Sequence, residues 1–190
     1  MSLFTRPAVA AINTSIQTYL STLRGLQKAA YYGVATNGVG EMDGIRVIAP
    51  YVFDSDGEGV FVGPDDSFDF ILYHRALSMS TVSKGGAFGD GTKEVRMTSN
   101  MSMIVYYNEK AVCLSPDDIF MVMASKISIP PTMGDVMGIS INLGSVSFNK
   151  EDIFASEYKA VPYNLSAEQQ IFRIDYTLEG TFRKDCLNIC

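Results

Sequence analysis

At 190 residues the chain is long enough for one domain with a sizeable buried core. Hydrophobic residues make up 47% and charged residues 19%, below the usual quarter, so part of the surface is expected to meet another protein rather than carry an ionic coat. The formal net charge is -6 and the 15 Lys and Arg residues form no run that could neutralise a row of phosphates, which argues against tight nucleic-acid binding.

The spacing of apolar residues predicts a first helix over residues 7–23. Its other face carries no charge between Arg6 and Arg24, although a free surface helix usually carries Lys and Glu. Two interpretations fit: a polar, solvated face, or a face that packs against a neighbouring subunit. The candidate contact residues on this face are Asn13, Gln17, Thr18 and Ser21.

From residue 31 to residue 77 the chain reads as β-structure. Segments 45–53 and 59–63 are β-branched and aromatic and flank an acidic, glycine-rich connection, so they predict a hairpin, and 68–77 predicts a further strand. Segment 83–93 holds four glycines and almost nothing apolar. It is typical of a mobile loop or hairpin tip that a partner could order, with Phe88 as a candidate contact.

Alternation predicts a long strand over residues 94–108 with one buried face. A helix follows: Ser115 can cap it, Pro116 fits its first turn, and two aspartates favour the positive end of its dipole. This helix is apolar nearly all round, so we expect the sheet on one side and another subunit on the other. The candidate contacts on it are Phe120, Met121 and Met123.

The last third predicts a strand over 139–148, with a bulge at Gly144 because the apolar parity changes there, a short helix over 150–154 and a final strand over 170–182. A short tail, 183–190, closes the chain. The expected fold is one α+β domain over 1–190: a mostly antiparallel β-sheet with two main α-helices packed on it and a long Gly-rich hairpin arm at about 83–93.

Two stretches resemble ligand-binding loops. Residues 54–65 (DSDGEGVFVGPD) match much of a calcium-binding EF-hand loop, but that motif needs flanking helices and the flanks read as strands. A plain hairpin turn is favoured, and a cation site of another kind stays open. Residues 86–93 have the glycine spacing of a phosphate loop, but a strand rather than a helix is expected to follow.

Candidate catalytic residues are few. His74 is the single histidine and lies in a predicted strand, where a structural role is the more common one. The cysteines Cys113, Cys186 and Cys190 are an odd set, which favours free thiols in a reducing environment, and the last two could supply half a zinc site without completing one. Acidic pairs lie in turn and capping positions. We therefore expect no enzyme, no catalytic residue, no cofactor and no metal.

The order of elements, with stretches such as SPDDIF at 115–120 and FRIDYTL at 172–178, resembles the tail-terminator and head-to-tail joining (neck ring) proteins of tailed bacteriophages. The resemblance spans residues 7–182, although the glycine-rich insertion has no counterpart in it. It implies a ring of six or twelve copies in the neck or tail of the virion, contacts with adjacent neck or tail proteins, and a lumen through which DNA passes without specific binding.

A monomeric β-rich ligand-binding or adhesin-like module is the alternative, with methionine and aromatic faces lining an apolar pocket. Ten methionines could also mark an adaptable binding surface or simply fill the core. No export signal is evident, because polar residues 13–15 interrupt the small-residue stretch at 8–11. The longest uninterrupted apolar run, 119–124, is far below the roughly 20 residues that span a bilayer, so we expect a soluble protein without a membrane partner.

Overall fold

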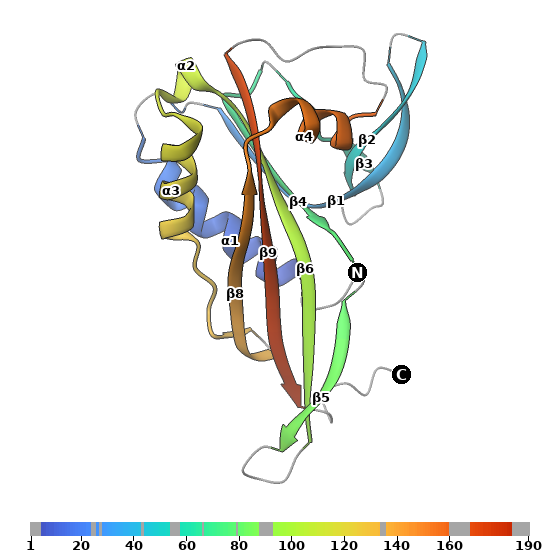
Figure 1. Cartoon of the computed structure of the whole chain (residues 1–190), viewed down its shortest axis with the longest axis vertical. Coiled ribbons are helices and arrows are strands. Elements are labelled where there is room, and N and C mark those ends of the chain that lie inside the picture. Colours follow the sequence, from blue (N-terminus) through green and yellow to red (C-terminus); the bar gives the residue numbers. More distant parts are fainter. Residues whose placement is uncertain are drawn as a thin grey trace.

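The computed structural model describes residues 5–23, 26, 28–42, 44–53, 58–65, 67–78, 80–87, 93–133, 136–159 and 168–183. These residues contain the helices α1 Thr5–Leu20, α2 Glu109–Val112, α3 Pro116–Lys126 and α4 Lys150–Glu157. The strands are β1 Ala29–Met42, β2 Ile45–Phe53, β3 Gly59–Phe61, β4 Phe70–Ala76, β5 Thr81–Ala87, β6 Lys93–Asn108, β7 Thr132–Met133, β8 Val136–Ser147 and β9 Gln169–Arg183. A broad body lies above a long, narrow extension that β5, β6, β8 and β9 form (Figure 1).

The strands form one nine-stranded sheet in the order β3-β2-β1-β4-β6-β9-β8-β7, with β5 beside β6. Every strand pair in it is antiparallel except β1 and β4. The expected α+β fold with a mostly antiparallel sheet is therefore confirmed. The longest ladder joins β6 to β9 without a register shift, from Glu94 opposite Arg183 to Asn108 opposite Gln169. This ladder connects the body to the extension.

Strand β1 takes part in two pairings. Residues 29–35 run parallel to β4, and residues 36–42 run antiparallel to β2. The second half, with β2 and β3, curls away from the main sheet into a small lobe of its own (Figure 1). Within the lobe, Gly38 and Gly40 leave room for the side chain of Tyr51, whose ring lies where a Cβ atom at Gly38 would stand and whose hydroxyl lies where one at Gly40 would stand.

Helices α1 and α3 cover one face of the main sheet. Alternation along the strands turns Leu72, Met103, Phe172 and their neighbours toward this face. α1 contributes Ala8, Val9, Ile12, Ile16 and Leu20 to the same core. α3 contributes Ile119 and Met123, and its Ser115 cap accepts a hydrogen bond from the backbone of Asp118 as the sequence predicts.

Among the described residues, α4 and the β1–β2–β3 lobe cover the upper part of the opposite face (Figure 1). This second core contains Ala49 and Val62 from the lobe, Tyr73 and Tyr106 from the main sheet, and Ile153 from α4. α4 runs to Glu157, longer than the expected single turn at 150–154, and Asn149 caps it.

Strand β8 is irregular at the position that the sequence predicts. The ladder between β8 and β9 shifts between Leu143 and Val146, which confirms the bulge predicted at Gly144. A Cβ atom at Gly144 would lie 3.1 Å from the carbonyl oxygen of Asp175, so the chains approach closely there.

The Gly-rich hairpin arm is not confirmed: residues 81–87 form β5 on the edge of β6, and residues 88–92 lie outside the described part of the chain.

Among the described residues, no helix has the length and apolar character needed to cross a bilayer.

Candidate interaction surface

Beyond Arg6, which is exposed in the first turn, the outer face of α1 is polar and uncharged. Gln17, Thr18 and Ser21 are exposed on it. The hydroxyl groups are already engaged by the helix, because Thr18 Oγ1 donates to the carbonyl of Thr14 at 2.7 Å and Ser21 Oγ donates to that of Thr18 at 3.0 Å. This part of the face, from Gln17 to Ser21, would therefore present mainly methyl and methylene groups and the Gln17 amide to a partner. No charged group there would have to lose its hydration on binding.

Asn13, the fourth candidate on α1, belongs to a hydrogen-bonded chain inside the protein. Its Nδ2 donates to the carbonyl of Tyr32 at 2.8 Å, so its Oδ1 accepts from Nε2 of His74, also at 2.8 Å. Nδ1 of His74 then accepts from the hydroxyl of Tyr176 at 2.7 Å. Asn13 thus has both of its amide atoms engaged within the chain and joins α1 to β1 and β4.

His74 is completely buried within this chain of hydrogen bonds. Burial lowers the pKa of His74 to about 3, because the charged imidazolium would lose its hydration. Burial also raises the pKa of Tyr176 well above its usual range. The imidazole is therefore neutral at ordinary pH with its proton on Nε2. With both ring nitrogens occupied, it acts as a structural connection between helix and sheet.

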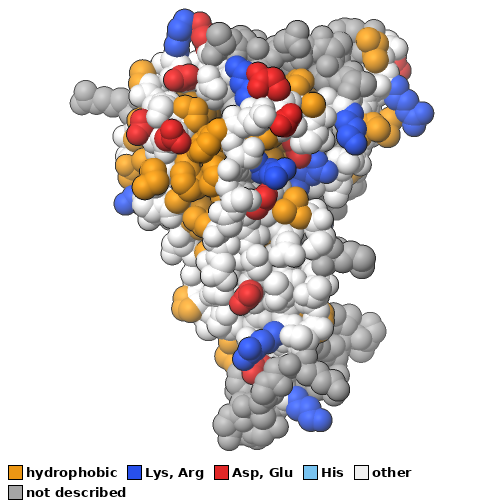
Figure 2. Space-filling view, viewed as in Figure 1, with side chains coloured by type: hydrophobic (Ala, Val, Ile, Leu, Met, Phe, Trp, Pro, Cys, Tyr) orange, Lys and Arg blue, Asp and Glu red, His pale blue; other side chains and the backbone are white. Residues whose placement is uncertain are grey.

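Helix α3 presents an apolar surface next to the edge of the sheet. Met121 is 64% exposed, and the half-buried ring of Phe120 lies 6.3 Å from that of Phe148, which is itself exposed. Figure 2 shows hydrophobic side chains gathered over α3 on the left of the molecule. We call Phe120, Met121 and Phe148 the α3 patch.

Met123, by contrast, is a core residue. It follows Ile119 by one helical turn, so both side chains point toward the sheet, and Met123 is 1% exposed. The expectation that Met123 contacts a partner is therefore wrong for this conformation. Phe88, the remaining candidate, lies outside the described residues.

A second apolar surface was not anticipated from the sequence. Val39 and Ile48 lie opposite each other on β1 and β2 and are 57% and 40% exposed, and Val60 on β3 is 48% exposed. We call Val39, Ile48 and Val60 the lobe patch. Strand alternation could have revealed it, because Arg46 and Ile48 point to the same side of β2 and an arginine is rarely buried.

A buried ionic cluster joins α4 to the sheet. Glu157 accepts hydrogen bonds from the Arg75 guanidinium and from the Tyr73 hydroxyl, and Arg75 also donates to the side chain of Asn37 on β1. Burial, with smaller contributions from Tyr158 and Glu157, raises the pKa of Tyr73 well above its ordinary value. These contacts hold β1, β4 and α4 together and explain why a charged pair lies in this core.

Two of the methionines that the ligand-binding alternative would place in a pocket belong to the core. Met101 and Met103 pack in the core under α1 and α3, so core filling accounts for them. An open hollow of about 710 Å³ lies elsewhere, near α2. Its lining residues are Glu109, Lys110, Cys113, Leu114, Ser115 and Glu168, of which Lys110 and Glu168 form an ion pair.

The described segments that flank the two motif-like stretches are strands, as the sequence predicts. β2 and β3 pair antiparallel up to Phe53 opposite Gly59, so residues 54–57, outside the described part, lie between two strands rather than two helices. The phosphate-loop-like stretch leads into β6 and not into a helix. Cys113 is an exposed free thiol, and Cys186 and Cys190 lie outside the described residues.

In the part of the chain that the structure describes, no group of three or more His, Cys, Asp or Glu residues could hold a metal ion. Of the predicted contact residues, Gln17, Thr18 and Ser21 share the exposed face of α1, while Phe120 and Met121 lie in the α3 patch. No protein-family model matches this chain, and no curated protein matches it significantly.

Proposed function

We propose that this protein is a structural subunit of a tailed bacteriophage virion. In this proposal it forms a homo-oligomeric ring, of six or twelve copies, in the neck or at the end of the tail. The ring joins head and tail or caps the tail tube and contacts the adjacent neck or tail proteins. The resemblance in element order noted above supports this function, since those proteins are small α+β subunits that act as rings.

The observation that carries the proposal is the surface around α1 and α3. Beyond Arg6 in its first turn, the outer face of α1 has no charged side chain, and the α3 patch on the neighbouring helix and strand exposes Met121 and Phe148. Apolar side chains exposed singly are common on monomers, but an aromatic and methionine patch next to an uncharged helix face is typical of a contact between proteins.

A ring at this position would surround DNA during packaging or ejection. The net charge of -6 makes the protein repel phosphates overall, so DNA would pass through the lumen without adhering. The described ion pairs involving Arg75 and Arg173 also place cations beside carboxylates rather than in a basic groove. A structural role requires no catalytic group, and we propose none.

Native mass spectrometry of the purified protein, combined with negative-stain imaging, tests the proposal. We expect a discrete closed assembly with a mass that is a small integer multiple of 20.8 kDa and a central hole. A species of 20.8 kDa at every concentration, with no annular particles, would contradict it. A basic stripe on the inner wall of the assembly would contradict only the passive passage of DNA.

A further inference from the structure

The chain enters and leaves the β1–β2–β3 lobe at two short joints. The parallel ladder of β1 with β4 ends at Ala35, and the antiparallel ladder of β1 with β2 begins at Thr36, so neither ladder crosses the joint. The chain leaves the lobe after β3 through residues 63–65, which belong to no helix or strand. Hinges in proteins commonly lie at such ends of elements, where a few backbone torsions absorb the change of direction.

Small side chains make the fully covered part of the contact between the lobe and the sheet. In the second core the lobe contributes Ala49 and Val62 as completely covered side chains, while Tyr51 and Phe61 are half-buried. Helix α1 is held by larger covered side chains, among them Ile12. Because apolar stabilisation grows with the area removed from water, packing alone holds the lobe less firmly than it holds α1.

Arg75 connects the sheet to both sides of the first joint. It lies on β4, opposite Ala35 in the parallel register. Its Nη1 donates to Oε2 of Glu157 on α4 at 2.5 Å, and its Nη2 donates to Oδ1 of Asn37, on the lobe half of β1, at 2.9 Å. The side chains of Arg75 and Glu157 are 20% and 7% exposed, so solvent weakens this ion pair little. The planar guanidinium donates in fixed directions and so fixes the lobe relative to α4.

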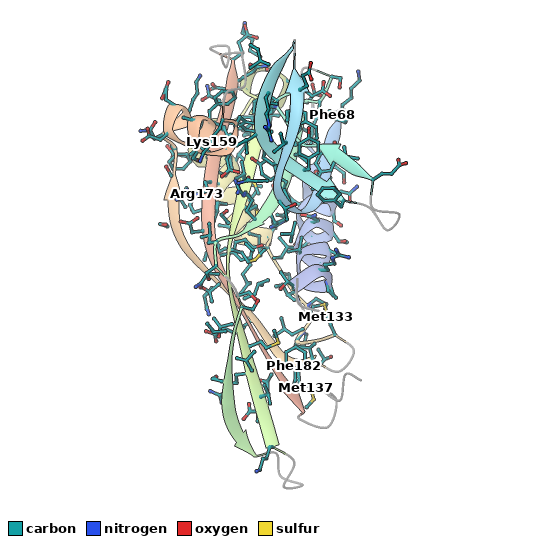
Figure 3. The ribbon with its side chains drawn as sticks, turned by 90° about the vertical axis from the view of Figure 1, so that its right-hand side faces the viewer. Phe68, Met133, Met137, Lys159, Arg173 and Phe182 are labelled. Atoms are coloured by element: carbon teal, nitrogen blue, oxygen red, sulfur yellow. The ribbon has the colours of Figure 1, made fainter. Side chains whose placement is uncertain are left out.

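One backbone hydrogen bond reports on the contact between the lobe and α4. The amide of Ile48 on β2 donates to the carbonyl oxygen of Lys159, just after α4, at 3.1 Å. Figure 3 looks onto this flank of the molecule and labels Lys159. The amide of Val62, by contrast, donates to the carbonyl oxygen of Pro50 at 2.9 Å, within the lobe. The Ile48 amide therefore exchanges when the lobe leaves α4, and the Val62 amide when the lobe itself comes apart.

We propose that the lobe is a hinged unit that can turn as one body about Ala35 and Thr36, and that Arg75 is the clamp that holds it against the sheet and α4. Release of the clamp spares the β1–β2 and β2–β3 ladders, because Arg75 belongs to neither. Opening therefore breaks the backbone bond between the lobe and α4 and leaves the bond inside the lobe intact. The device acts within one subunit and does not depend on the proposed ring.

Amide hydrogen exchange of the full chain, resolved to single residues by mass spectrometry, tests the hinge. Asn37→Ala removes the lobe side of the clamp and leaves the pair of Arg75 with Glu157 in place. It should speed exchange of the Ile48 amide by about tenfold or more, because a hydrogen bond to a charged group is lost, and change the Val62 amide by less than about twofold. Asn37→Asp keeps an acceptor for the guanidinium and should preserve the protection of the Ile48 amide.

Arg46→Ala is the matched control, because Arg46 is exposed on β2 within the lobe and is not part of the clamp. It should leave both amides as in the unmodified protein, and urea unfolding should show that all three variants remain folded. An unchanged Ile48 amide in the Asn37→Ala variant would refute the clamp, and so would equal acceleration by Arg46→Ala. If the Ile48 and Val62 amides accelerate together, the lobe unfolds instead of turning, and the hinge is refuted.

Discussion

The stability of this protein should fall as the pH drops from about 7.5 to about 5.5, because of His74 alone. The histidine is the single one in the chain, and burial lowers its pKa to about 3 in the folded state, against about 6.5 when unfolded. A lowered folded pKa means that the unfolded state binds the proton more readily. The stabilisation is therefore complete above about pH 6.5 and is lost as the pH falls from about 6.5 toward about 3.

The magnitude follows from the unfolded state. At about pH 5.5 an exposed imidazole with pKa about 6.5 is protonated ten to one, which stabilises the unfolded chain by about 1.4 kcal/mol, while at about pH 7.5 the effect is below about 0.1 kcal/mol. Ordinary carboxyl groups titrate at about pH 4 and contribute little in this interval. Urea unfolding at both pH values, at one low protein concentration, should show the loss of about 1.4 kcal/mol.

His74→Gln supplies the control, because the variant has no imidazole in either state. It should be less stable than the parent at about pH 7.5, yet its free energy of unfolding should stay nearly constant down to about pH 5.5. A parent protein with equal stability at both pH values would refute the claim that His74 is buried and neutral. The same conclusion would follow if the His74→Gln variant showed the full pH dependence.

Three further substitutions test particular contacts by urea unfolding. Asn13→Ala should cost about 2 kcal/mol, because it leaves the buried imidazole N–H without an acceptor, whereas Gln17→Ala on the exposed face of the same helix should change stability by less than about 0.5 kcal/mol. Glu157→Gln should cost about 2 to 4 kcal/mol by leaving a largely buried guanidinium without its counter-charge, and a loss below about 0.5 kcal/mol would show that the pair is solvated. Cys113→Gly should stabilise by roughly 1 kcal/mol, since Cys113 ends α2 with φ of 56°, a conformation that glycine adopts freely, and no gain would indicate a different backbone there.

Local signals in the sequence predicted the elements that depend on local physics. Ser115 and the residues after it determine where α3 begins, because capping and dipole effects act within one turn. The parity change around Gly144 revealed the bulge in β8, because a one-residue slip would turn the apolar side chains to the wrong face. The α1 helix ends at Leu20, three residues before the predicted end at residue 23. Leu23, the last residue of the apolar spacing, still packs against the core beyond the end of the helix.

Contacts between distant residues could not be read from the sequence in the same way. The parallel pairing of β1 with β4 depends on a crossover that no local pattern reports, and β1 carries glycines in place of a clear alternation. His74 and Asn13 are separated by 61 positions, so no local pattern indicates the hydrogen bond between them. The sequence showed that the first helix carries no charge between Arg6 and Arg24. It did not show that Asn13 would be hydrogen-bonded to His74 inside the protein instead of meeting a partner.

The division of β1 between two partners has a consequence for how the lobe is held. The ladder to β4 ends at Ala35 and the ladder to β2 begins at Thr36, so the two ladders by themselves would permit a bend between these residues. The orientation of the lobe therefore depends on side-chain packing in the second core, through Ala49 and Val62, and on the backbone bond from Ile48 to Lys159. In a ring of the proposed kind, a substitution that loosens this packing would change the angle between the lobe and the sheet in every copy.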